Sequence, residues 1–226
     1  MSTLTLIMAI CSLTPQAHAR GGVQKKAVFE VDPFSSRAMV TVRHTFGAYD
    51  IPNTNARGEM EISSDQGIRR FWVAFGIKGF DSGNRTLNCH LQEALGLDYR
   101  QSNFPDRHVC ENDRLPMKGK NAVRYPEVAF RSIDGGSTPW GMGDAPRELS
   151  LAGTWSIHGV DLPATMKIQF QKTEKGHRAR GKSKISLKDF GVIVRGFLFI
   201  SVKDEVQVEW DVEFRPDPMD ASPPFI

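Results

Sequence analysis

The dominant pattern in the chain is a two-residue alternation of apolar and polar side chains. Across residues 206–214, valine, tryptophan and phenylalanine occupy the even positions, while glutamine, aspartate and glutamate occupy the odd ones. Successive side chains of a β-strand point to opposite faces of a sheet, so this segment predicts a strand with one buried and one solvated face. Comparable alternation occurs at residues 58–62, 70–77, 149–157, 166–170 and 178–185.

Residues that favour tight turns separate the alternating segments. Asp-Pro stands at 32–33, Asp-Gln-Gly at 65–67, Asp-Gly-Gly at 134–136 and Lys-Gly at 175–176. About eight short strands at hairpin-like spacing predict an all-β domain, either a sandwich or a closed antiparallel barrel. Neither an internal repeat nor a linker divides the chain, so residues 20–226 are predicted to form one domain.

Three segments depart from the alternation. Residues 88–97 predict one short helix, and the polar, aperiodic residues 98–124 predict an insertion after it. Cys89 and Cys110 fall in these two segments, and in an oxidising compartment such a pair favours a disulfide that pins the insertion. Two free thiols or a redox pair are the alternatives. The proline-rich tail at 215–226 is predicted to fray.

The N-terminus carries the pattern of a signal peptide. An apolar run at 4–13 precedes Ala17-His18-Ala19, which predicts cleavage before Arg20 and export to the periplasm or the cell exterior. Removal of residues 1–19 would also remove Cys11 and leave the even pair of cysteines. Lys and Arg are missing before position 20, so an apolar N-terminal tail is the alternative interpretation.

The composition and the motifs of the sequence limit the classes of function that the chain can have. The net charge is only +3, and the basic residues within 172–188 alternate with others, so we expect no nucleic-acid partner. The sequence contains no glycine-rich phosphate loop, nucleophile elbow or HExxH motif. We therefore expect a binding protein that is not an enzyme and needs neither a cofactor nor a metal.

Four motifs in order give the chain a family resemblance. They occupy residues 29–33 with 40–47, 125–132, 151–160 with Pro163, and 185–192 with 204–206. Together they resemble the YceI-like family of lipid-binding periplasmic proteins. The resemblance implies an eight-stranded antiparallel, lipocalin-like β-barrel whose elongated pocket holds a polyisoprenoid or a similar fatty amphiphile. The chain departs from the family in its longer insertion at 98–124, and in Trp155 and Asp161, where Leu and Thr are common.

Apolar residues on the inward faces of the predicted strands are the candidates for the pocket wall. They are Val42, Met60, Phe75, Phe130, Trp155, Ile168, Phe170, Val208 and Trp210. The alternative is that these side chains simply fill a closed core, because an eight-stranded barrel is just wide enough for either arrangement.

The polar candidates lie at predicted strand ends. Arg43, His44 and His158 could contact a ligand headgroup, although a surface ion pair for Arg43 and hydrogen-bonded structural roles for the histidines are the alternatives. His90 and His108 lie near the helix and the insertion. A tetrahedral metal site needs three or four ligands, so two distant histidines do not predict one.

Two other functions compete with lipid binding. A small hydrolase or redox enzyme would use His44, His158 and the cysteines, and would bring them together in one pocket. A periplasmic stress or interaction protein would act through its surface, with residues 98–124 as the contact. A homodimer is also compatible with a barrel that keeps exposed strand edges.

Overall fold

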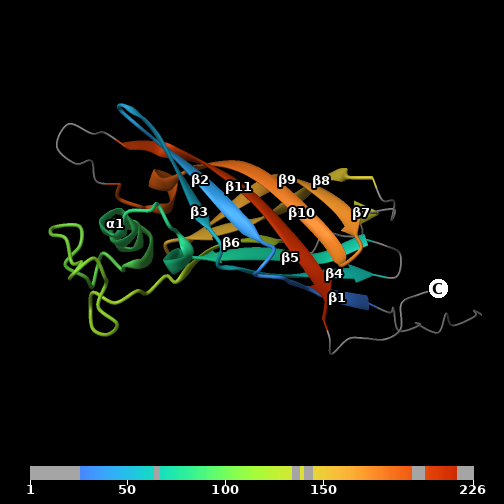
Figure 1. The fold of residues 1–226 in the computed structure, drawn as a ribbon, viewed down its shortest axis with the longest axis horizontal. Coiled ribbons are helices and arrows are strands. Elements are labelled where there is room, and N and C mark those ends of the chain that lie inside the picture. Colours follow the sequence, from blue (N-terminus) through green and yellow to red (C-terminus); the bar gives the residue numbers. More distant parts are fainter. Residues whose placement is uncertain (1–25, 64–66, 134–137, 140–144, 195–201, 218–226) are drawn as a thin grey trace, which may run out of the picture.

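A computed structural model of the protein describes residues 26–63, 67–133, 138–139, 145–194 and 202–217 (Figure 1). The predicted signal peptide at 1–19 lies outside the described residues. So do the predicted turn at 134–136, part of the turn at 65–67, and the tail beyond residue 217.

The sheet contains a closed ring of eight antiparallel strands, in the order β1-β4-β5-β6-β8-β9-β10-β11, with β11 pairing back onto β1. The ring strands are β1 (Lys26–Val31), β4 (Ala56–Ser63), β5 (Gly67–Gly76), β6 (Glu127–Ser132), β8 (Arg147–Ile157), β9 (Val160–Thr173), β10 (Gly176–Ser186) and β11 (Val202–Pro216). This confirms the predicted all-β, eight-stranded antiparallel barrel.

Three further strands join the ring. The hairpin of β2 (Arg37–His44) and β3 (Gly47–Asn53) pairs with β11 through β2, and β7 (Thr138–Pro139) pairs with β5. Besides β10, the long strand β11 pairs with two more strands, because β1 uses its C-terminal end and β2 uses positions within residues 202–211. Its last residues, Arg215 and Pro216, pair with β1, although they fall within the tail that the sequence predicts to fray.

The predicted alternation is present in the burial of the strands. Along β11 the apolar residues at even positions from 206 to 214 are all buried, and their polar neighbours are less so. Between β8 and β9 the chain turns through His158 and Gly159, which have φ angles of 51° and 74°. A two-residue hairpin loop of type I′ requires a positive φ angle at both positions, and the His-Gly pair meets this requirement.

One half of the barrel interior is solidly packed with aromatic side chains. Phe71 is fully buried, and its ring lies 5.5 Å from that of Phe170, 5.7 Å from Phe214 and 5.9 Å from Trp210. Met60 and Ile168 are fully buried in the same core. Because the rings fill this half, any internal cavity must lie elsewhere in the barrel.

The helix α1 (Arg85–Gly96) lies at one end of the barrel, next to the loops of the insertion (Figure 1). It begins at Arg85 instead of the predicted residue 88, because the Asn84 side chain caps it by accepting a hydrogen bond from the backbone N–H of Leu87. No helix in the described part of the chain has the length and apolar character needed to cross a membrane.

Residues 97–124 pack as a small unit beside α1. Leu97, Phe104 and Val109 form a separate buried apolar cluster, and the predicted disulfide joins Cys89 of α1 to Cys110 of the insertion. The described residues also include two short 3-10 helices, η1 (Ile77–Gly79) after β5 and η2 (Leu187–Phe190) after β10.

Candidate ligand cavity

A cavity of about 430 Å³ lies between α1 and the unfilled half of the barrel. Strands β2, β3, β5, β6, β8, β10 and β11 supply its apolar wall, together with η2 and the residues that follow it. From α1, Leu87, Leu91, Ala94 and Leu95 line the cavity. This spacing repeats every three to four residues, so one face of the helix is directed at the cavity.

Most polar residues of the cavity wall belong to α1, its N-cap or the insertion beside it. They are Asn84, Thr86, His90, Glu93 and His108, whereas Tyr49 comes from β3. Several are already engaged, because Asn84 caps the helix and the Thr86 hydroxyl donates to Asp113. The cavity therefore has an apolar part and a polar end. This combination suits an amphiphilic ligand.

The structure divides the apolar candidates into two groups. Val42, Phe75, Trp155 and Val208 line the cavity. Met60, Phe130, Ile168, Phe170 and Trp210 do not, and all five lie in the packed core. For this second group the core-filling alternative describes the structure.

The polar candidates from the sequence lie outside the cavity lining. Arg43 is exposed on β2, and the His44 ring stacks on Tyr49 at 4.5 Å while its Nδ1 accepts a hydrogen bond from the backbone N–H of Phe46. His158 has its Nε2 atom 2.8 Å from the carbonyl oxygen of Leu97, to which it donates.

The contacts of these two histidines bear on the enzyme hypothesis. Both His44 and His158 are used in hydrogen bonds to the backbone, and the cysteines are joined to each other. A hydrolase or redox centre would need these groups together and free to react. Their arrangement therefore gives no support to that hypothesis.

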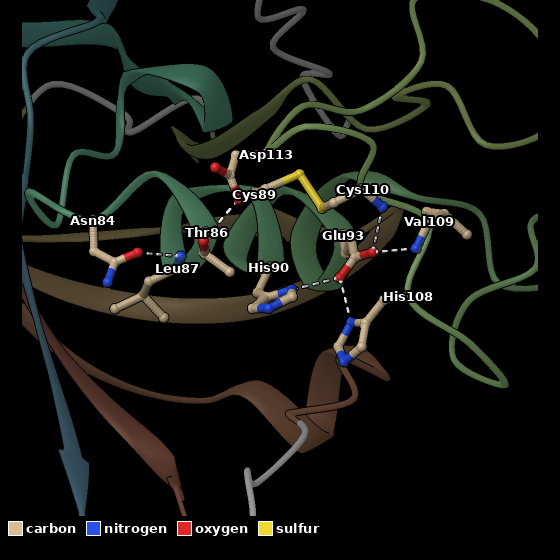
Figure 2. Close-up of a disulfide and its surroundings, with 10 residues drawn as sticks. All are labelled: Asn84, Thr86, Leu87, Cys89, His90, Glu93, His108, Val109, Cys110 and Asp113. Carbon is tan, nitrogen blue, oxygen red and sulfur yellow. Dashed lines mark hydrogen bonds and ion pairs between the residues drawn. A yellow bond between two sulfur atoms is a disulfide. The ribbon is translucent and has the colours of Figure 1, made fainter.

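Sequence reasoning missed a polar cluster around Glu93. This glutamate is fully buried, and its Oε2 atom lies 2.9 Å from His90 Nδ1 and 3.0 Å from His108 Nδ1 (Figure 2). Its Oε1 atom accepts hydrogen bonds from the backbone N–H groups of Val109 and Cys110, at 2.6 and 3.1 Å. The four donors come from both α1 and the insertion, so Glu93 joins the two.

These contacts also determine the charge of Glu93. Burial opposes ionisation most strongly, but the hydrogen bonds from His108, Val109 and His90 together outweigh it and hold the pKa of Glu93 below its ordinary value. The carboxylate is therefore ionised at neutral pH. Within α1, the sequence signal for this cluster was the i, i+3 spacing of His90 and Glu93 on the predicted helix.

Comparison with known proteins places this architecture in a family. The model of the YceI-like domain matches residues 29–214. A solved polyisoprenoid-binding domain from Saccharophagus degradans, described as implicated in plant cell wall breakdown, has a TM-score of 0.58 at 12% identity. The match covers 85% of this chain and all of that one.

A second solved structure has the same fold. BcnA from Burkholderia cenocepacia has a TM-score of 0.55 at 14% identity, with 80% of this chain and 98% of that chain covered. A comparison with curated proteins finds no match. Since the family model spans the barrel from β1 to β11 and two structures share its fold, the chain belongs to the YceI-like family.

Proposed function

We propose that this protein binds a long-chain isoprenoid, or a similar amphiphilic lipid, with the apolar chain inside the cavity and without catalysis. The observation that carries the proposal is the apolar cavity beside α1 in a barrel whose other half is filled. Its volume of about 430 Å³ falls within the usual range of ligand pockets. The family relationship supports the same ligand class, because one structural relative is described as a polyisoprenoid-binding domain.

The energetics favour an apolar ligand. An isoprenoid tail that loses about 300 Å² of apolar surface to the cavity gains about 7.5 kcal/mol before the costs of association. In this proposal Val42, Phe75, Trp155 and Val208 contact the tail, and the α1 end of the cavity receives the headgroup. The residues of the packed core contribute to stability instead.

We also propose that the protein works in the periplasm or outside the cell. The Cys89–Cys110 disulfide supports this location, because disulfides form and persist in oxidising compartments. The signal-peptide pattern at residues 1–19 supports it from the sequence.

Native mass spectrometry of the purified full chain tests lipid binding. We expect a bound amphiphile of discrete mass that organic extraction removes and a prenol suspension restores. Val42→Trp should abolish uptake by filling the cavity, whereas Met39→Trp, on the outer face of the same strand β2, should retain it. Wild-type protein that neither carries nor takes up an amphiphile would overturn the proposal, and so would equal uptake by the two variants.

A further inference from the structure

The polar end of the cavity has the composition of a metal site. We propose that His90, Glu93 and His108 bind one divalent transition-metal ion of the zinc class. One ligand atom from each of these side chains lies within 4.8 Å of the other two. Two imidazoles and one carboxylate form a common type of zinc site, which leaves a fourth coordination position open. This inference does not depend on lipid binding, because it rests only on the three side chains and their supports.

The spacing of the ligand atoms is already close to what an ion requires. Zinc bonds nitrogen and oxygen ligands at about 2.0–2.2 Å, so a tetrahedral ion keeps neighbouring ligand atoms about 3.3–3.4 Å apart. The Oε2 atom of Glu93 lies 2.9 Å from His90 Nδ1 and 3.0 Å from His108 Nδ1. An outward shift of about 0.4 Å in each contact would admit the ion.

Other parts of the protein hold the carboxylate in place. Glu93 Oε1 is fixed by the backbone N–H groups of Val109 and Cys110, which leaves Oε2 facing both imidazoles (Figure 2). The disulfide joins Cys89, the neighbour of His90, to Cys110, two residues after His108. Contacts of this kind orient metal ligands and raise the affinity of a site.

The site is accessible although its carboxylate is buried. The side chains of His90 and His108 are 37% and 48% exposed, and Glu93 is fully buried. All three residues line the cavity. An incoming ion can therefore reach the imidazoles, and its open position is available to water or to the polar end of a molecule in the cavity.

Metal binding would change the tautomer of both histidines. An ionised carboxylate only accepts hydrogen bonds, so both Nδ1 atoms carry a proton that they donate to Glu93. A metal needs the Nδ1 lone pairs, so each imidazole gives up its Nδ1 proton when the ion binds. The loss of the Nδ1–H groups is visible in the ¹⁵N chemical shifts of the rings.

Titration of the untagged full chain, first stripped with a chelator, tests the proposal. We expect one Zn²⁺ per chain by calorimetry, and a visible absorption band when Co²⁺ replaces it. His90→Gln and His108→Gln should each weaken Zn²⁺ binding about tenfold or more. Arg107→Gln is the matched control, because Arg107 is exposed and adjacent to His108 but contributes no ligand.

Two results would overturn the metal site. One is wild-type protein that binds no Zn²⁺ or binds it no better than the two histidine variants. The other is persistence of both Nδ1–H tautomers in excess Zn²⁺, which would leave only a hydrogen-bonded cluster. Circular dichroism checks the fold of each variant. Because the side chains of His90 and His108 are partly exposed, we expect both variants to fold. Prenol-free and prenol-loaded samples are titrated separately, so failure of lipid binding leaves this test intact.

Discussion

Trp210 on β11 is the register partner of Gly181 on β10, and a Cβ atom at position 181 would lie only 2.2 Å from its indole Cζ2 atom. The indole occupies space that any other residue at 181 would take, and it stacks on Phe71 at a ring distance of 5.9 Å. Gly153 makes room for Phe130 in the same way, with an added Cβ at 2.5 Å from the ring. Because Gly153 and Gly181 have no side chain, they leave room on the barrel wall for the aromatic rings that fill one half of the interior.

Gly181→Ala should destabilise the protein by about 1–3 kcal/mol, because the added methyl group forces Trp210 out of its packed position. The sign is informative, since replacing glycine by alanine within a strand ordinarily stabilises it. Urea unfolding followed by tryptophan fluorescence measures the change. Ser183→Ala on the same strand is the control and should stay within about 0.5 kcal/mol of wild type. Equal stability of all three proteins would contradict the packing argument.

Phe71→Ala should lower the free energy of unfolding by about 3–5 kcal/mol, because it leaves a void among four aromatic rings. Phe71 does not line the cavity, so the folded fraction should still take up prenol at the wild-type stoichiometry. Chemical denaturation gives the stability, and native mass spectrometry gives the stoichiometry. A loss of uptake by folded protein would show that the two halves of the barrel are not independent.

The barrel itself was predictable from the sequence because its strands are solvated on one face. The alternation at 206–214 predicts which side chains of β11 face inward, and the structure confirms this prediction. The alternation does not indicate how far along the barrel axis each inward side chain lies. That position follows from strand tilt and register, which place Val208 at the cavity and Trp210, two residues later, in the packed core.

The polar cluster was beyond prediction for a different reason. His90 and Glu93 are three residues apart on a helix, but His108 and the backbone N–H of Val109 come from an insertion without any periodic pattern. Their meeting depends on how that loop folds onto α1, and no local rule specifies such a path. The cysteine pair was the one signal that tied the two segments together.

Replacing Cys89 and Cys110 by serine should cost about 3 kcal/mol of stability, since the bond closes a loop of 21 residues. The loss should be local, because the barrel ring does not include the insertion. Hydrogen exchange should accelerate at residues 98–124 and remain slow in β10 and β11. The double variant is preferable to reduction of the wild type, because reduction would leave Cys89 and Cys110 as free thiols that could bind metal ions themselves. Uniformly faster exchange across the barrel would contradict the local role.

Acidification should destabilise the protein between about pH 6.5 and pH 4 through His177. This residue is buried on β10, with its ring 4.5 Å from that of Phe29. Burial above all, assisted by the charge of Lys172, lowers its pKa to about 4. The unfolded chain takes up a proton near pH 6.5 while the folded chain does not, so unfolding becomes more favourable as the pH falls through this window.

The full stabilisation is present above pH 6.5, and the loss on reaching pH 4 should be up to about 3 kcal/mol. Urea unfolding at pH 7, 5.5 and 4 measures it. His177→Phe removes the titrating group and should flatten the stability profile between pH 6.5 and 5, where the lowered pKa values of Glu93 and Asp211 keep both carboxylates ionised. Below about pH 4, where His177 is protonated in both the folded and the unfolded wild type, the variant and the wild type should lose stability in parallel as carboxylates protonate. An unchanged slope above pH 5 in His177→Phe would assign the pH dependence to other groups.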